Sequence, residues 1–321
     1  MKRSLLLFLK AIVSLGLLSF FLSRIDLFHV LRALSSAHVS YVAIALVVYL
    51  FGQLVSSLRW ALLARTLGFQ NPWKDFTVFY FIGMFFSLFT PSTVGGDLGR
   101  IFYLARDRTK ETEGARAGST AFATISVITD RTVGMAALTW IGAVAVAAFP
   151  GYSLPSAIRY LTFAVALGFV LGCVSLPLFS CLLRGRESAV GKNVQLALQA
   201  YRGHWHILVQ AMLLSLIVHF LQSWMQVLIG HALEVEIPWS YGLIIYPLVG
   251  TFSALPISLN GIGLREGGYL FLLRRIGISS EKAIAFGLLW FIIIALDSLI
   301  GGVVFILRKT PSLAQARPQV K

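Results

Sequence analysis

Eight apolar stretches follow one another along this chain, and they limit its fold more than any other feature. They cover residues 5–23, 40–63, 76–90, 117–149, 157–182, 206–230, 241–257 and 283–307. Most are close to the ~20 residues that a helix needs to cross a bilayer. Because a bilayer core offers no water to exposed backbone groups, spanning segments of this length are helical. The sequence therefore predicts an all-α integral membrane protein.

Composition supports this prediction and narrows the choice of partners. Hydrophobic residues make up 57% of the 321 residues and charged residues only 12%, which is outside the range of soluble domains. The formal net charge is +14. The basic residues lie in short loops between apolar stretches, where they orient a membrane protein and contact anionic lipid headgroups. We therefore expect a membrane lipid, anionic or zwitterionic, as partner and no nucleic acid.

Two ten-residue segments, 91–100 and 256–265, share an unusual pattern. Each follows a short apolar stretch and has Pro first, Gly sixth and Arg tenth. Duplicated, broken segments of this kind in a membrane chain indicate a substrate site between half-helices near the bilayer midplane. The alternative is two unrelated loops that share three identities in ten.

The stretches that precede these segments either cross the membrane or form hairpins that return to the face from which they entered. If every stretch crosses, the basic residues divide 13 against 10 between the two faces, leaving out the four arginines within segments, Arg59, Arg100, Arg131 and Arg265. If 76–105 and 241–275 are re-entrant hairpins, the division becomes 17 against 6. Because basic residues concentrate on the cytoplasmic face, the count favours the hairpins.

The hairpin model predicts six full spans with both termini in the cytoplasm. Three spans separate the hairpins, which would enter from opposite faces and form an inverted repeat. Stretch 5–23 is expected to be an uncleaved span and not a signal peptide, because Lys10 interrupts it. We expect one transmembrane domain over 1–309, an interfacial or kinked start to 117–149, and a disordered cytoplasmic tail at 310–321.

Arg100 and Arg265 are the strongest candidates for a binding role. An arginine at membrane depth costs between about 3 and 17 kcal/mol unless it faces protein, water or an anion. Each follows the expected break between the two half-helices of its hairpin, where the returning half-helix presents unbonded N–H groups and a positive dipole end. Since arginine also binds phosphate through two parallel hydrogen bonds, the two arginines predict a phosphate site. The alternatives are an ion pair of Arg100 with Asp97 and snorkelling of Arg265 to the interface.

Small and polar residues surround both arginines at the expected hairpin tips. The glycines permit tight turns and close approach to a ligand, or simply close packing of membrane helices. The polar side chains would donate to a ligand or satisfy broken backbone. These tip residues are Ser92, Thr93, Gly95, Gly96, Asn260, Gly261 and Gly263.

Further charged residues lie in or beside apolar sequence and suggest ion pairs or gating groups. Asp97, Asp130, Arg131, Glu266 and Asp297 form this set. Neighbours such as Asp130 and Arg131 diverge on a helix, so each is expected to reach a different element. Asp297, inside the last stretch, is the leading candidate for a buried counter-ion to an arginine, or for a proton-coupling carboxylate. Arg59 and Trp60 are interpreted as interfacial.

The two motif segments, together with Asp130-Arg131 between them, resemble the lysylphosphatidylglycerol synthase transmembrane-region family. That family includes the flippase-like part of aminoacyl-phosphatidylglycerol synthases and stand-alone membrane proteins. The resemblance implies movement of a lipid between leaflets, with Arg100 and Arg265 at matching motif positions. In fused members a cytosolic domain makes the aminoacyl lipid, and this chain stops soon after its last stretch, so synthase activity is not expected.

These observations predict a flippase or scramblase-like transporter of a phosphate-bearing lipid in a bacterial inner membrane. No nucleotide, metal or dinucleotide motif is visible in the sequence, and no cofactor is expected. One alternative is a membrane-embedded transferase acting on a phospholipid- or polyprenyl-linked substrate, with Asp97, Glu266 or Asp297 as base. Another is an accessory subunit that works with lipid-synthesis enzymes. A homo-oligomer is compatible with the sequence.

Overall fold

A computed structural model describes residues 27–89, 94–108, 116–182, 195, 197–254, 261 and 263–307. Regular structure in these residues is entirely helical. The helices are α2 (Leu27–Ser35), α3 (Val39–Thr66), α4 (Trp73–Phe89), α5 (Val94–Arg108), α6 (Arg116–Ala148), α7 (Ser156–Leu182), α9 (Trp205–Ala232), α10 (Trp239–Ser253), α11 (Leu264–Arg274) and α12 (Ser280–Leu307). The predicted all-α class is confirmed.

Five helices are long and apolar enough to cross a membrane. These segments are Val39–Thr66, Ser119–Ala148, Ser156–Ser175, Trp205–Ala232 and Ser280–Leu307. They coincide with five of the six full spans that the sequence predicts. The sixth, 5–23, and the tail, 310–321, lie outside the described residues.

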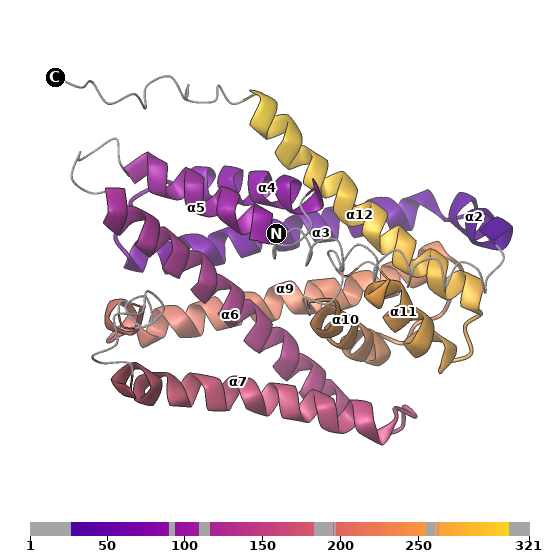
Figure 1. Cartoon of the computed structure of the whole chain (residues 1–321). Coiled ribbons are helices and arrows are strands. Elements are labelled where there is room, and N and C mark those ends of the chain that lie inside the picture. The colour runs from indigo at the N-terminus through magenta and orange to yellow at the C-terminus, as the bar shows by residue number, and fades with distance from the viewer. Residues whose placement is uncertain are drawn as a thin grey trace, which may run out of the picture.

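Helix α6 is as long as the sequence predicts for its segment. The structure forms the segment as one continuous helix of 33 residues, which runs obliquely across the bundle (Figure 1). An interfacial or kinked start to it stays a prediction. A tilted helix can place more residues in the apolar layer without a break.

The connections between helices gather at two ends of the molecule. At the α3–α4 end, the Tyr201 hydroxyl donates to the Leu63 carbonyl, and the Ser119 hydroxyl donates to the Ala105 carbonyl. At the α9–α10 end, the Arg275 guanidinium donates to the carbonyl of Ser153. The long helices run between these two ends (Figure 1).

Helices α4 and α5 pack together as a helical hairpin, as do α10 and α11. The first hairpin has its outer ends at the α3–α4 end, and the second has them at the α9–α10 end (Figure 1). With 17, 15, 15 and 11 residues, these helices reach only about 16–26 Å at 1.5 Å per residue. Each is shorter than the ~30 Å hydrocarbon layer.

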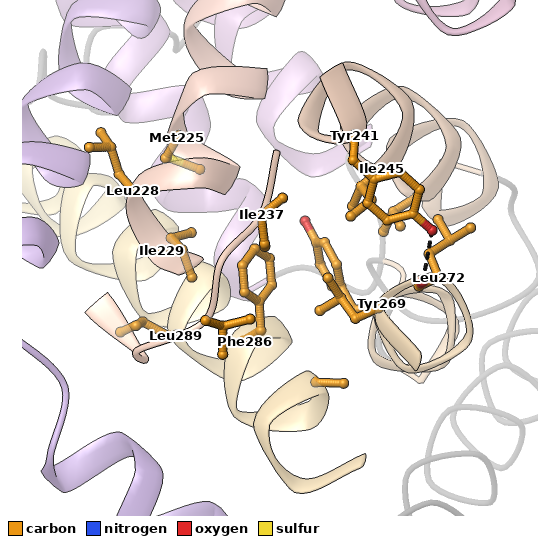
Figure 2. Close-up of a cluster of buried hydrophobic side chains, with 14 of the residues drawn as sticks. Met225, Leu228, Ile229, Ile237, Tyr241, Ile245, Tyr269, Leu272, Phe286 and Leu289 are labelled. Carbon is orange, nitrogen blue, oxygen red and sulfur yellow. Dashed lines mark hydrogen bonds between the residues drawn. The ribbon is translucent and has the colours of Figure 1, made fainter. Parts of the chain in front are cut away.

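Each end of the molecule has its own hydrophobic core. One core lies near the α3–α4 end around Trp60 and Phe76, and it joins the parts of α3, α4, α5, α6 and α9 that lie there. The other joins α9, α10, α11 and α12 with parts of α2, α3 and α6, and Figure 2 shows part of it. There the Tyr241 hydroxyl donates to the Leu272 carbonyl at 2.8 Å, which ties α10 to α11 (Figure 2).

Glycines let the helices of this bundle approach each other closely. A Cβ atom at Gly96 would collide with the Gly83 carbonyl, so α4 and α5 cross backbone to backbone. A Cβ atom at Gly301 would collide with the Phe81 carbonyl, where α12 crosses α4. Small residues at helix crossings are the usual device for close packing in membranes.

Candidate functional site

A cavity of about 400 Å³ lies between the two core clusters. Its walls come from α3, α4, α5, α6, α9, α10, α11 and α12. Arg100 of the first hairpin and Arg265 of the second both line it. The structure thus brings together the two arginines that the sequence singles out, although they are far apart in the chain.

Arg100 is held by a buried carboxylate and by two aromatic rings. Its Nη2 donates to Asp130 Oδ2 at 2.8 Å, and both side chains are almost fully buried. Its guanidinium carbon lies 4.2 Å from the ring centre of Trp60 and 4.6 Å from that of Tyr80. Cation–π contact and a charged hydrogen bond both favour a fixed guanidinium orientation.

The expected pair of Arg100 with Asp97 is present but long, at 3.7 Å. Asp97 instead accepts from Nε and Nη2 of Arg131 at 3.0–3.1 Å. Asp130 and Arg131 therefore bind different residues, but both contact α5, so the prediction that each reaches a different element is met only in part, by the contact of Asp130 with α3. The closest counter-ion of Arg100 comes from α6 and not from its own helix.

Asp130 also binds Arg59, which was wrongly interpreted as interfacial. Arg59 Nε donates to Asp130 Oδ1 at 2.7 Å, and Arg59 Nη1 donates to the Ser215 hydroxyl at 2.9 Å. Both Arg59 and Trp60 are buried. Their position inside stretch 40–63 was the available signal, because an arginine that deep in an apolar segment normally has a buried partner.

Arg265 is the second residue of α11, where its backbone N–H is bonded to the Gly261 carbonyl at 2.9 Å. Its guanidinium carbon lies 4.5 Å from the ring centre of Trp290, and only 9% of the residue is exposed. Gly261 and Gly263 both have positive φ angles, 76° and 84°, which suit glycine and allow the turn before α11.

The remaining predicted residues occupy other positions. The Glu266 carboxylate accepts from the Gly263 N–H at 2.7 Å and so caps α11. Asp297 is buried, but it is not among the residues lining the cavity, and no ion pair of it is found within the described residues. The expectation that it neutralises an arginine is not met there. Gly95 and Gly96 begin α5, whereas Ser92, Thr93 and Asn260 lie outside the described residues.

The charges that line the cavity do not cancel. Four arginines and two aspartates are present: Arg59, Arg100, Arg131, Arg265, Asp97 and Asp130. This leaves an excess of two positive charges in the cavity wall. In addition, Arg100 Nε and Trp290 Nε1 are buried without a hydrogen-bond partner in the described part of the chain. A buried donor left unpaired is costly, so the cavity suits a ligand that is anionic and rich in acceptors.

The family model of the lysylphosphatidylglycerol synthase TM region matches residues 7–301. The chain belongs to this family. Among curated proteins, a search finds no significant match.

Membership in the lysylphosphatidylglycerol synthase TM region family confirms the resemblance carried by the two motif segments. The matched residues make up nearly the whole chain and include both hairpins and the residues that line the cavity between them. Together with the five candidate membrane spans, it identifies a multi-pass membrane protein linked to lipid handling.

Proposed function

We propose that the protein moves a phosphate-bearing lipid between the leaflets of a bacterial inner membrane. The observation that carries this proposal is the convergence of Arg100 and Arg265 on one cavity with excess positive charge. An anionic headgroup that enters hydrocarbon meets a penalty comparable to that of a charged side chain. The two guanidinium groups would offset that penalty at mid-depth.

The hairpins supply the path in this proposal. Each would be re-entrant, dipping into the membrane from its own face, so that the pair forms an inverted repeat around the cavity. With the basic residues of the α3–α4 end in the cytoplasm, both termini would also be cytoplasmic. The headgroup would pass through the polar cavity while the acyl chains stay in lipid.

The positions of the carboxylates favour translocation over a transferase. Of the three carboxylates considered as a base, Asp97 is bonded to Arg131 and Glu266 caps α11. Asp297 does not line the cavity. A general base must come within hydrogen-bond reach of the proton that it removes, and none of these three is both unengaged and in the cavity wall.

The test is leaflet exchange in vesicles that contain the purified protein and a fluorescent phosphatidylglycerol. The Arg265→Gln variant is expected to slow exchange by about 10- to 100-fold, the value of one charge-assisted hydrogen bond. Arg265→Lys should retain part of the rate, because the charge stays but the fork is lost. Arg274→Gln, which changes an exposed arginine of the same helix, is the matched control.

A labelled glycolipid without phosphate, in the same vesicles, tests the choice of headgroup. It should exchange no faster with protein than without. Wild-type exchange rates in Arg265→Gln would reject the proposal. Mass spectrometry of the lipids after incubation would detect a new lipid species if the protein were a transferase.

A further inference from the structure

A second cavity, apolar and about 340 Å³ in volume, lies beside the arginine cavity. Its walls come from α6, α7 and α10. Met135, Thr139, Leu161, Val165, Pro247 and Phe252 are among the residues that line it. We call it the acyl groove, and we propose that it holds one acyl chain of the lipid whose phosphate occupies the arginine cavity. This inference rests on the proposed function.

The groove has the chemistry of a hydrocarbon site. None of the residues that line it is charged. The hydroxyl of Thr139 donates to the Ala136 carbonyl at 3.0 Å, and that of Thr162 donates to the Ile158 carbonyl at 2.8 Å. Because these hydroxyls are bonded within their own helices, both threonines can present methyl groups without burying an unpaired polar atom.

The groove exists because α7 leaves a close helix crossing partly uncovered. Helices α6 and α10 approach so closely at Gly142 that a Cβ atom there would lie 2.9 Å from Pro247 Cβ. Helix α7 packs chiefly against α6, and it lies at the margin of the bundle (Figure 1). Leu161, on the wall of the groove, is 46% exposed. A lipid chain could therefore enter from the bilayer between α7 and α10.

The groove and the arginine cavity adjoin each other. Met135 lines both of them. Leu138 and Gly250 line the arginine cavity, and their chain neighbours Thr139 and Thr251 line the groove. A lipid with its phosphate at the arginines would thus have an apolar channel directly beside its glycerol region. Neither cavity alone provides for both parts of such a molecule.

The direction of the groove selects one leaflet. From Met135 to Gly142 it follows two turns of α6, about 10 Å at 1.5 Å per residue, toward the α9–α10 end. That end is opposite the one with most basic residues. In the proposed orientation, the groove therefore holds a chain in the leaflet that faces away from the cytoplasm.

The experiment uses vesicles that contain the full-length protein and a phosphatidylglycerol with a photoreactive diazirine midway along one acyl chain. After illumination, mass spectrometry should locate adducts within 135–142, 161–169 and 247–254. Excess unlabelled phosphatidylglycerol should reduce them. Adducts spread evenly over the exposed face of α7, which includes Leu167 and Leu171, would show only surrounding bilayer lipid and overturn the groove.

A pair of filling variants tests the role of the groove in transport. Val165→Trp should slow leaflet exchange by about tenfold, because the indole ring would displace part of the acyl chain from the groove. Tenfold corresponds to about 1.4 kcal/mol, which is the burial free energy of about two methylene groups of the chain. Leu167→Trp adds the same ring to an exposed position that does not line the groove, and it should exchange at the wild-type rate.

The two proposals fail in different ways. Wild-type exchange in Val165→Trp, with slow exchange in Arg265→Gln, would overturn the groove and leave the headgroup site intact. Groove adducts with unchanged exchange in Arg265→Gln would overturn the proposed function and keep the groove as a chain-binding site.

Discussion

Asp130 is the residue that holds the arginine network in place. It accepts from Arg59 on one oxygen and from Arg100 on the other, at 2.7 and 2.8 Å. One buried carboxylate thus neutralises part of the charge of two buried guanidinium groups from different helices. Because it serves both, the remaining positive charge of the cavity stays available for a ligand. The network also keeps Arg100 in one position before any ligand arrives.

Asp130→Asn should strongly destabilise the protein. The substitution leaves Arg59 and Arg100 buried without their counter-ion, and breaking a buried pair in this way typically costs about 3–5 kcal/mol. The measurement is thermal unfolding in detergent, followed by the loss of helical circular dichroism.

Arg131→Gln is the matched control for that substitution. It breaks the neighbouring pair with Asp97, but 45% of the Arg131 side chain is exposed. The pair is less buried than the one between Asp130 and its arginines, so its loss should destabilise the protein less. If Asp130→Asn and Arg131→Gln unfolded at the same temperature, the buried network would not have the structural role described here.

At the level of helices, the α4–α5 hairpin depends on contact between two backbones. Gly83 and Gly96 face each other, and a Cβ atom at Gly83 would lie 2.8 Å from Arg100 Cγ. The same crossing therefore sets the separation of the helices and the position of Arg100. In the second hairpin, the glycines act at the turn instead, where positive φ angles at Gly261 and Gly263 allow the chain to enter α11.

Gly96→Ala should separate α4 from α5 and greatly lower the yield of folded protein. The added methyl group meets the Gly83 carbonyl, and backbone at a helix crossing cannot move aside as a flexible side chain can. The yield of monodisperse protein after size-exclusion chromatography in detergent measures the effect.

Gly99→Ala lies one turn farther along α5 and provides the comparison. There the nearest atom, on the Phe86 ring, would be 3.5 Å from the new Cβ. That is an ordinary contact, and alanine is more favourable than glycine in a helix by up to about 1 kcal/mol. Normal yield of Gly96→Ala would contradict the close crossing, whereas Gly99→Ala should fold at least as well as the wild type.

In the whole molecule, two hairpins approach the centre from opposite ends, and the arginine cavity lies where they meet. The charges that follow the two hairpins differ. Arg100 has Asp130 as a close counter-ion, whereas Asp297, on α12 after the second hairpin, is not ion-paired within the described residues.

Cysteine labelling should place the two ends of the molecule on opposite faces of the membrane. In a background without Cys173 and Cys181, cysteines at Gln70 and Arg106 should react with a membrane-impermeant reagent from one face. Cysteines at Glu236 and Arg274 should react only from the other. The reason is that each hairpin returns to the end from which it started (Figure 1). Labelling of Gln70 and Arg106 from different faces would mean that the first hairpin crosses the membrane.

Much of this structure follows from local features of the sequence. The five described spans coincide with apolar stretches, because the length and hydropathy of a segment decide whether it can cross a bilayer. The short stretches before the two Pro-Gly-Arg segments become hairpin helices for a similarly local reason. They are too short to span, and the glycines that follow allow a turn. Arg100 and Arg265 could be picked out as candidate binding residues from the sequence, because a charged side chain next to apolar sequence is costly unless it has a partner.

The partners of those charges were decided only by the tertiary structure. Asp130 and Arg59 are separated by 71 residues, and the rotation of α3 about its axis relative to α6 determines whether they meet. Apolar patterning does not specify this rotation for helices that are hydrophobic on most sides. For the same reason, the sequence indicated Asp97 and Asp297 as counter-ions of the arginines, whereas in the folded protein the close counter-ion of Arg100 is Asp130. The acyl groove likewise arises from how three helices cross, and no single segment encodes it.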